Sequence, residues 1–330
     1  MKIEQVTNTE EAHMGVNYYS NIKPSHVEWL WYPYIPCGKV TLLQGDPGEG
    51  KSTFIIHLVS VLTNAGTLPD GYKVKEAINV IYQCSEDGLA DTVKPRLLEA
   101  GADCEKVAYI TEDDTALTLD DERIESAIKQ ANAKLLVIDP LQAFIGQDSD
   151  MQSAVKMRKV LGRLADMASQ NNCAVVLVGH MNKSNGGKNL YRGLGSIDIA
   201  AIARSILMIS RDKDEPSKRY MFPVKSSLAP EGDTIGFAFD RKIGFQWLGK
   251  CNVDIDELML DNSGTTAKKD SAMLQLRIIL ADTDVPSIQI FKMMNQIGIS
   301  RRTVQEAKKE LGIQAYKKGN AWYWHMNVMG

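Results

Sequence analysis

Residues 45–52 read Gly45-Asp46-Pro47-Gly48-Glu49-Gly50-Lys51-Ser52 and match G-x-x-x-x-G-K-[ST], the pattern of a phosphate-binding P-loop. Residues 39–44 are apolar and β-branched, which predicts a buried strand, and residues 53–62 predict an apolar helix. An ordinary glycine-rich turn before a helix would share part of the pattern. The order of strand, loop and helix favours the P-loop instead.

The residue types of this loop suit a nucleoside triphosphate. Glycines let successive backbone amides turn toward an anion, and the following helix adds its positive dipole end. Lys51 would reach the phosphates, and the Ser52 hydroxyl would ligate Mg²⁺. The sequence therefore predicts ATP and Mg²⁺ as ligands. The expected nucleotide contacts are Gly45, Asp46, Pro47, Gly48, Glu49, Gly50, Lys51, Ser52 and Thr53.

Composition places the chain among globular proteins with more than one domain. It has 330 residues, of which 44% are hydrophobic and 24% are charged. The formal net charge is −3, but residues 266–330 hold ten Lys and Arg against five Asp and Glu, which gives +5 there and −8 elsewhere. A basic tail on an acidic body is typical of proteins that bind nucleic acid.

The cysteines and the apolar runs predict a cytoplasmic protein. Five scattered cysteines without C-x-x-C spacing indicate neither a disulfide framework nor a zinc site. Residues 1–20 do not resemble a signal peptide, and no apolar run approaches the roughly 18 residues of a membrane span, so we expect no membrane partner.

Alternating apolar strands and amphipathic helices predict an α/β fold with a mostly parallel sheet covered by helices. Residues 27–36 are rich in aromatics and prolines, and predict an extended segment that either packs on the parent domain or contacts a neighbouring subunit or an adenine ring. Predicted strands cover residues 79–84, 107–110, 135–138, 174–180, 205–209 and 220–224; predicted helices cover 89–100, 121–130 and 151–170.

Polar side chains follow several of these strands and should meet at the carboxyl edge of the sheet. Asp139 ends an apolar strand in the manner of a Walker B carboxylate that holds Mg²⁺, although an aspartate before a proline can also cap a turn. Glu86 is the favoured base for the attacking water, with Asp87 as its rival. His180 ends another strand and is expected to sense the γ-phosphate.

These motifs resemble, in order and spacing, the RecA-type ATPases of the RepA hexameric helicase group. The likeness covers about residues 27–250 and rests on the aromatic segment 29–36, the P-loop, residues 85–87, the Asp139 strand and residues 179–180. It implies a catalytic role for Glu86 and a sensor role for His180. It also implies a homo-hexameric ring with ATP between subunits, and a basic residue inserted from the neighbour.

Lys225 is the first candidate for that inserted residue, and Arg204 is the second. The glycine-rich stretch 181–193 resembles the loop that contacts single-stranded DNA in the pore of RecA-like rings. Its basic residues would neutralise phosphates, unless the stretch is only a solvated surface loop. They are Lys183, Lys188 and Arg192.

The basic tail predicts a winged helix-turn-helix. A polar linker at 261–269 precedes helices at 272–280, 287–296 and 301–311, the second capped by Ser287, and a hairpin at 313–325 follows. The third helix would face duplex DNA and the hairpin tip would lie near phosphates, although such domains also bind proteins. The expected contacts are Arg301, Arg302, Gln305, Lys308, Lys309, Lys317 and Lys318.

The predicted organisation is an arm and aromatic linker (1–36), an ATPase domain (37–260), a linker (261–269) and a winged-helix domain (270–330). We expect Mg²⁺-dependent ATP hydrolysis by an oligomeric motor on DNA, most simply a plasmid- or phage-type replicative helicase or translocase. The alternative is an ATP-gated DNA-binding switch that does not unwind DNA. A small-molecule kinase fits least well, because no lid or acceptor pocket is evident.

Overall fold

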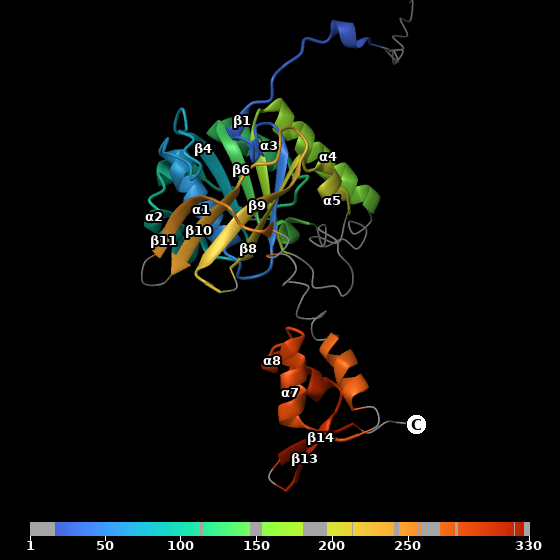
Figure 1. Ribbon diagram of the computed structural model, residues 1–330. Helices are drawn as coiled ribbons and strands as arrows, with labels where there is room; N and C mark the ends of the chain where they lie inside the picture. The colour runs from blue at the N-terminus through green and yellow to red at the C-terminus, as the bar shows by residue number, and fades with distance from the viewer. Residues whose placement is uncertain are drawn as a thin grey trace, which may run out of the picture.

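A nine-stranded sheet forms the centre of the protein, with the strand order β11-β10-β9-β8-β3-β7-β6-β4-β5 (Figure 1). The computed structural model describes residues 17–112, 115–145, 154–180, 197–212, 214–240, 244–255, 258, 271–280, 283–319 and 321–326. The strands are β3 (Val40–Gly45), β4 (Asn79–Cys84), β5 (Val107–Ala108), β6 (Ala133–Asp139), β7 (Ala174–His180), β8 (Ser205–Arg211), β9 (Lys218–Ser226), β10 (Thr234–Asp240) and β11 (Gly244–Cys251).

The six strands from β8 to β5 in this order pair in parallel, whereas β9, β10 and β11 add in antiparallel pairs. This arrangement confirms the predicted α/β fold with a mostly parallel sheet covered by helices. The sequence did not predict β10 and β11. Strand β11 lies at the sheet edge with every residue at least partly exposed, so it lacks the continuous apolar run that marked the central strands.

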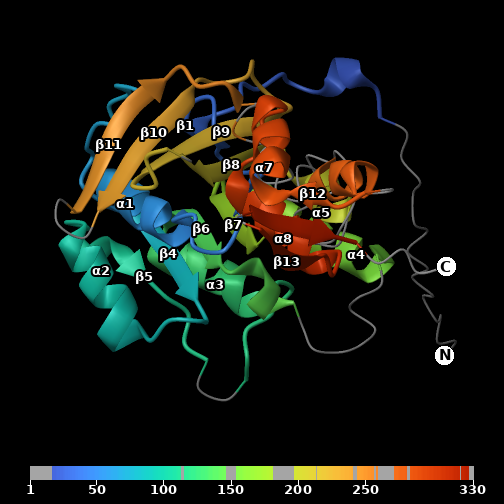
Figure 2. The same ribbon diagram turned by 60° about the horizontal axis from the view of Figure 1, so that its bottom comes forward.

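Helices cover both faces of the sheet (Figure 2). They are α1 (Lys51–Thr63), α2 (Lys94–Glu99), α3 (Glu122–Ala131), α4 (Ala154–Gln170) and α5 (Ile197–Ile202), with a π-helical turn η2 (Leu89–Val93) before α2. Successive strand residues point to opposite faces, so Leu43 packs in the core under α1 and α2, while Leu42 packs under α3, α4 and α5. The P-loop helix is therefore held over one face by its own buried side chains.

The aromatic segment forms a small hairpin, β1 (Trp29–Trp31) and β2 (Ile35–Pro36), that packs on α1. Trp31 is fully buried, and its ring centroid lies 6.3 Å from that of Phe54 on α1. The Tyr34 hydroxyl donates to the Asp233 carbonyl at 2.8 Å. Packing on the parent domain, one of the two interpretations of this segment, is confirmed by that burial.

Residues beyond 270 form a unit with its own core. Residues 271–279 are helical, followed by α7 (Ser287–Gln296), α8 (Arg301–Glu310) and a sheet of order β12-β14-β13, formed by β12 (Val285–Pro286), β14 (Ala321–His325) and β13 (Gln314–Lys318). The core comprises Ala272, Leu276, Leu280, Ile290, Met294, Ile299, Val304, Ala307, Ile313 and Trp324.

One predicted cap in this unit was wrong. Ser287 is the first residue of α7, and the N-cap is Pro286, which has no side-chain hydrogen bond to the helix. Pro286 also belongs to β12, which pairs with β14, so the chain turns directly from strand to helix. Helix α8 is capped by Ser300, whose hydroxyl accepts a hydrogen bond from the Thr303 amide at 3.2 Å.

Candidate functional site

The predicted strand ends meet at one edge of the sheet. Parallel pairing sets Gly45 opposite His180, and Cys84 opposite Asp139. The P-loop after β3, the segment after β4, Asp139 and the backbone of His180 thus share the carboxyl edge. The His180 side chain and the loop with Lys183, Lys188 and Arg192 lie outside the described residues, so their expected roles stay predictions.

The P-loop backbone needs glycine at specific positions. Gly48 and Gly50 have φ angles of +81° and +89°, the left-handed region that side chains disfavour. A Cβ on Gly45 would lie 2.5 Å from the Ile209 carbonyl oxygen of β8. Gly50 is the N-cap of α1 and offers no side-chain bond to the first amides of the helix. Those amides remain available to an anion.

The Lys51 amine is buried and folded back onto the loop. Nζ donates to the Gly45 carbonyl at 2.8 Å and to the Asp46 carbonyl at 3.0 Å. Burial lowers the pKa of Lys51, and the charge of Asp139 opposes that shift most, followed by those of Asp46, Glu49 and Glu86. A phosphate chain in the loop would replace two carbonyl oxygens with stronger, anionic acceptors.

Asp139 is only 5% exposed and is held by a residue that sequence reasoning missed. The Tyr82 hydroxyl, from the neighbouring strand β4, donates to Asp139 Oδ2 at 2.9 Å. Burial, and then the charge of Asp139, raise the pKa of Tyr82, so it remains a neutral donor. No motif marks Tyr82, because the contact depends on the register of β4 against β6.

The two carboxylates after β4 have different surroundings. Asp87 Oδ2 pairs with the Arg96 guanidinium of α2 at 2.6 Å. Glu86 is exposed, and its charge acts on the buried Lys51 amine. The ion pair turns Asp87 toward the helix, which favours Glu86 as the group that faces a nucleotide.

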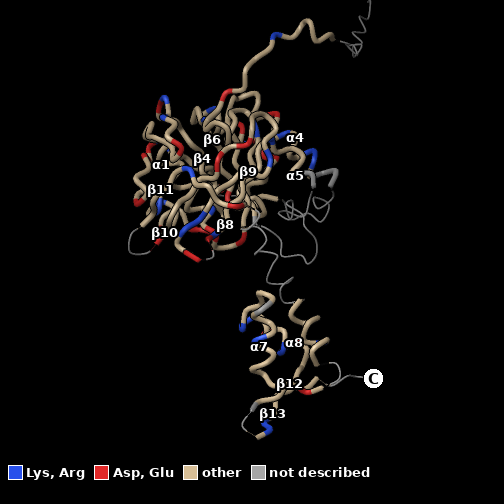
Figure 3. Tube along the Cα trace, viewed as in Figure 1, with Lys and Arg blue, Asp and Glu red and all other residues tan. Residues whose placement is uncertain are grey.

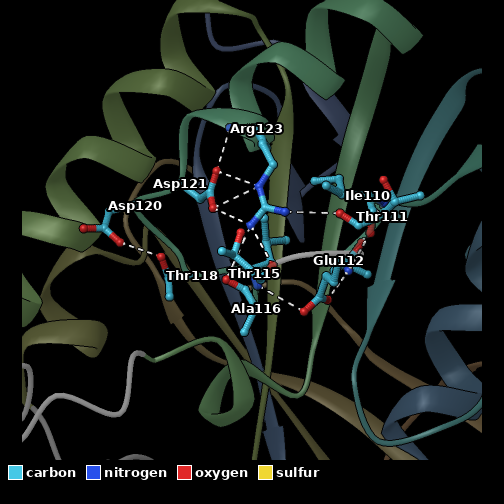
Figure 4. A network of polar contacts seen from close by, with 11 residues as sticks. Ile110, Thr111, Glu112, Thr115, Ala116, Thr118, Asp120, Asp121 and Arg123 are labelled. Atoms are coloured by element: carbon cyan, nitrogen blue, oxygen red, sulfur yellow. Dashed lines mark hydrogen bonds and ion pairs between the residues drawn. The ribbon is translucent and has the colours of Figure 1, made fainter.

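A polar network fixes the loop beside the end of β4. The buried Gln83 side chain donates to Glu112 Oε1 at 2.7 Å and accepts from the Ile110 amide at 2.9 Å. The other Glu112 oxygen accepts from the Leu117 amide at 3.0 Å. Figure 4 shows the adjoining contacts, in which Arg123 binds Asp121 and loop carbonyls. Strand β4, which leads into the Glu86 segment, is thereby anchored at Gln83, three residues before Glu86.

The two candidates for a residue acting on a neighbouring subunit also differ. Lys225 Nζ donates to the carbonyls of Ala200 and Ala203, at 2.8 and 2.9 Å, and so closes the carboxyl end of α5. The first candidate is thus engaged within its own chain. Arg204 is exposed and lies close enough for its charge to lower the pKa of Lys225, after burial. This geometry favours Arg204.

Basic residues of the C-terminal unit lie on α8 and at the β13–β14 hairpin (Figure 3). Several rest on aromatic rings. Arg301 lies 4.6 Å from the ring centroid of Phe291, Lys308 lies 4.9 Å from that of Trp324, and Lys318 lies 5.9 Å from that of Tyr323. Arg302, Lys309 and Lys317 are exposed, and Arg302 pairs with Glu306 at 3.0 Å.

The described part of the chain lacks two further features. No group of three or more His, Cys, Asp or Glu side chains there is arranged to hold a metal ion. No helix in that part is long and apolar enough to cross a bilayer.

Three comparisons relate the chain to known proteins. It is 29% identical to the DNA repair protein RadA of Streptococcus pyogenes serotype M3 over 148 residues, which cover 44% of this chain and 28% of that one. It is 30% identical to RadA of Streptococcus pneumoniae over 148 residues, 44% and 31% of the two chains. The match therefore spans less than a third of either relative.

Among solved structures, the KaiC-like protein of Pyrococcus horikoshii is 21% identical, with a TM-score of 0.48, over 64% of this chain and 90% of that one. The profile of the AAA_25 family, described as AAA domain, matches residues 9–186, which is more than half of the chain and includes the P-loop, Glu86, Asp139 and His180. The protein is a member of this AAA domain family.

Proposed function

We propose that the protein is a Mg²⁺-dependent ATPase that assembles into a ring and acts on DNA. The observation that carries this proposal is the meeting of the P-loop, Lys51, Asp139 and the Glu86 segment at one sheet edge. The relatives named as DNA repair proteins support DNA as the partner.

The residues at this edge fit a nucleotide and its metal ion. The N-cap of α1 leaves amides free for phosphate oxygens. The Ser52 hydroxyl and the buried Asp139 carboxylate are oxygen donors of the kind that Mg²⁺ prefers. We assign the metal to these two residues, with Tyr82 holding the Asp139 carboxylate in place. When bound, Mg²⁺ would neutralise phosphate charge.

Hydrolysis then needs a cation on the phosphates and a base for water. Lys51 would leave the Gly45 and Asp46 carbonyls and donate to the phosphate chain instead. Glu86 would accept a proton from the attacking water, since Asp87 is occupied by Arg96. His180 would report the γ-phosphate to the loop that follows β7. Arg204 of one subunit would reach the nucleotide of the next, with Lys225 as the weaker candidate.

DNA would be bound in two places. In a hexamer, Lys183, Lys188 and Arg192 would line the pore around a single strand. The unit at 270–330 would act as a winged helix joined by the 261–269 linker, with α8 and the hairpin on duplex DNA. Its exposed Arg301, Arg302 and Lys309 suit phosphate contacts. Within this proposal the favoured role is a replicative helicase or translocase.

One observation favours a second candidate, an ATP-gated DNA-binding switch. The basic C-terminal unit has a hydrophobic core of its own, so it can bind DNA whether or not the ATPase moves along it. Two assays on the full chain separate these roles. A motor hydrolyses ATP faster with single-stranded DNA and displaces an annealed strand. A switch changes its DNA affinity with nucleotide but displaces nothing.

A further inference from the structure

The P-loop of this chain contains two carboxylates and one cation, which is unfavourable for binding a polyphosphate. Asp46 and Glu49 contribute two negative charges and Lys51 one positive charge, so residues 45–52 carry a formal charge of −1. A nucleoside di- or triphosphate brings several more negative charges to the same loop. Positive charge from elsewhere in the fold is therefore needed to offset that repulsion.

Two arginines, one on β8 and one on β9, lie against this loop. Arg211, at the end of β8, donates from Nη2 to the Gly48 carbonyl at 2.5 Å. Arg219, on β9, is 7% exposed, and its Cδ would lie 3.0 Å from a Cβ placed on Gly50. One Arg219 nitrogen donates to the carbonyls of Ser217 and Phe239, at 3.0 and 3.4 Å. The loop thus rests on two guanidinium groups.

Glu49 belongs to the same cluster as these two arginines. Both guanidinium charges act on its carboxylate, that of Arg211 more strongly. Among described residues, six buried side-chain nitrogen or oxygen atoms are without a hydrogen-bond partner. Three of the six are in this cluster: Glu49 Oε2, Arg211 Nε and Arg219 Nε. Unsatisfied buried groups are costly, and half of those in the described residues are concentrated in this cluster against the P-loop.

We propose that Arg211 and Arg219 hold Glu49 away from the phosphate site and offset its charge, so that nucleotide affinity depends on this three-residue cluster. The two arginines are positioning residues, because they act through Glu49 and the Gly48 carbonyl rather than on the reacting atoms. Burial raises the pKa of Glu49, and the charge and backbone amide of Arg211 oppose that rise. The arginines thus stabilise the charged form of Glu49, which burial alone would destabilise.

This inference rests on the proposed nucleotide binding and is tested by a double-mutant cycle with Mg²⁺-ADP as the probe. Calorimetry on the full chain would compare wild type, Arg211→Ala, Glu49→Gln and the double variant. Arg211→Ala should weaken ADP binding at least about tenfold when Glu49 is present, and less than about threefold in the Glu49→Gln background. Arg211→Lys should retain most of the affinity, since it keeps the charge. Lys129→Ala, which removes a surface cation paired with Glu125, is the matched control and should bind like wild type.

The same four proteins should be unfolded in urea without nucleotide. Arg211→Ala should lower the unfolding midpoint more when Glu49 is present than in the Glu49→Gln background. If Arg211 had only a structural role, its replacement by alanine would lower the urea unfolding midpoint equally in both backgrounds. ADP affinity would then also fall equally in both. Equal losses of ADP affinity in the two backgrounds, or no loss in either, would overturn the inference. If wild type binds no ADP, the proposed function fails, and the nucleotide-free cycle still decides whether Arg211 offsets the charge of Glu49.

Discussion

The Tyr82 hydroxyl donates a hydrogen bond to Asp139 Oδ2 at 2.9 Å, across the pair of strands β4 and β6. Both side chains are buried, at 3% and 5% exposure. This bond fixes one carboxylate oxygen of the residue that we assign to Mg²⁺. The orientation of a metal ligand is commonly set by such an outer contact.

Tyr82→Phe should therefore weaken the metal site without removing it. The ring stays in the core and the hydroxyl is lost, so we expect the free energy of unfolding to change by about 1 kcal/mol. The Mg²⁺ concentration that gives half-maximal ATP hydrolysis should rise roughly tenfold, the low end of outer-contact effects. A Mg²⁺ titration of ATPase activity measures this. An unchanged half-maximal Mg²⁺ concentration would mean that Tyr82 does not influence the metal site.

Glu86→Gln and Asp87→Asn form a matched pair of charge-removing variants. Glu86→Gln should bind ATP but lose turnover by at least about 100-fold, since the base is removed. Asp87→Asn should lose only its surface ion pair with Arg96 and keep turnover within a few-fold. Single-turnover hydrolysis and nucleotide binding would be measured for both. If Glu86→Gln hydrolysed ATP normally and Asp87→Asn did not, Asp87 rather than Glu86 would be the base.

Arg204→Ala should be inactive alone and complement a Glu86→Gln chain. In a ring, some mixed interfaces would pair an intact Arg204 with an intact Glu86, so ATPase activity should return when the two variants are mixed. Lys225→Ala should instead lower thermal stability, because it uncaps the carboxyl end of α5. Recovery with Lys225→Ala mixtures, but not with Arg204→Ala mixtures, would restore Lys225 as the inserted residue.

The C-terminal unit should supply salt-dependent DNA affinity. Log affinity falls with log salt by roughly 0.7 to 0.9 per phosphate contact, so a chain truncated near Thr265 should show a shallower slope and weaker binding. Replacing Arg301, Arg302, Lys308 and Lys309 with alanine should reproduce this without unfolding, since Val304 and Ala307 form the buried face of α8. Equal DNA affinity and equal salt slope for both variants and wild type would indicate a protein-binding unit.

Local sequence patterns predicted the parts of the fold that depend on continuous runs. Strand β4 has the predicted bounds, and Asp139 lies at the edge where strand direction places it. The hairpin of β10 and β11 was missed because β11 is half-exposed and carries Gly244 and Gly249 at positive φ. Such a strand lacks the apolar run on which the prediction relied.

Contacts between distant strands were the part that sequence could not supply. Tyr82 meets Asp139, 57 positions away, only through the register of β4 against β6. Arg211 meets Gly48, 163 positions away, through the pairing of β8 with β3. Lys225 is a basic residue near a strand end, as expected, but its bonds to α5 carbonyls follow from packing that no motif encodes.

We propose that the P-loop at residues 45–52 is the site of ATP hydrolysis, with Lys51 as the cation on the phosphates. The most direct measurement is the ATPase rate of Lys51→Ala beside wild type, with circular dichroism to verify that the variant is folded. We expect Mg²⁺-dependent turnover by wild type, and a loss of at least about 100-fold with weaker nucleotide binding in the variant. Turnover by a folded Lys51→Ala at the wild-type rate would contradict it.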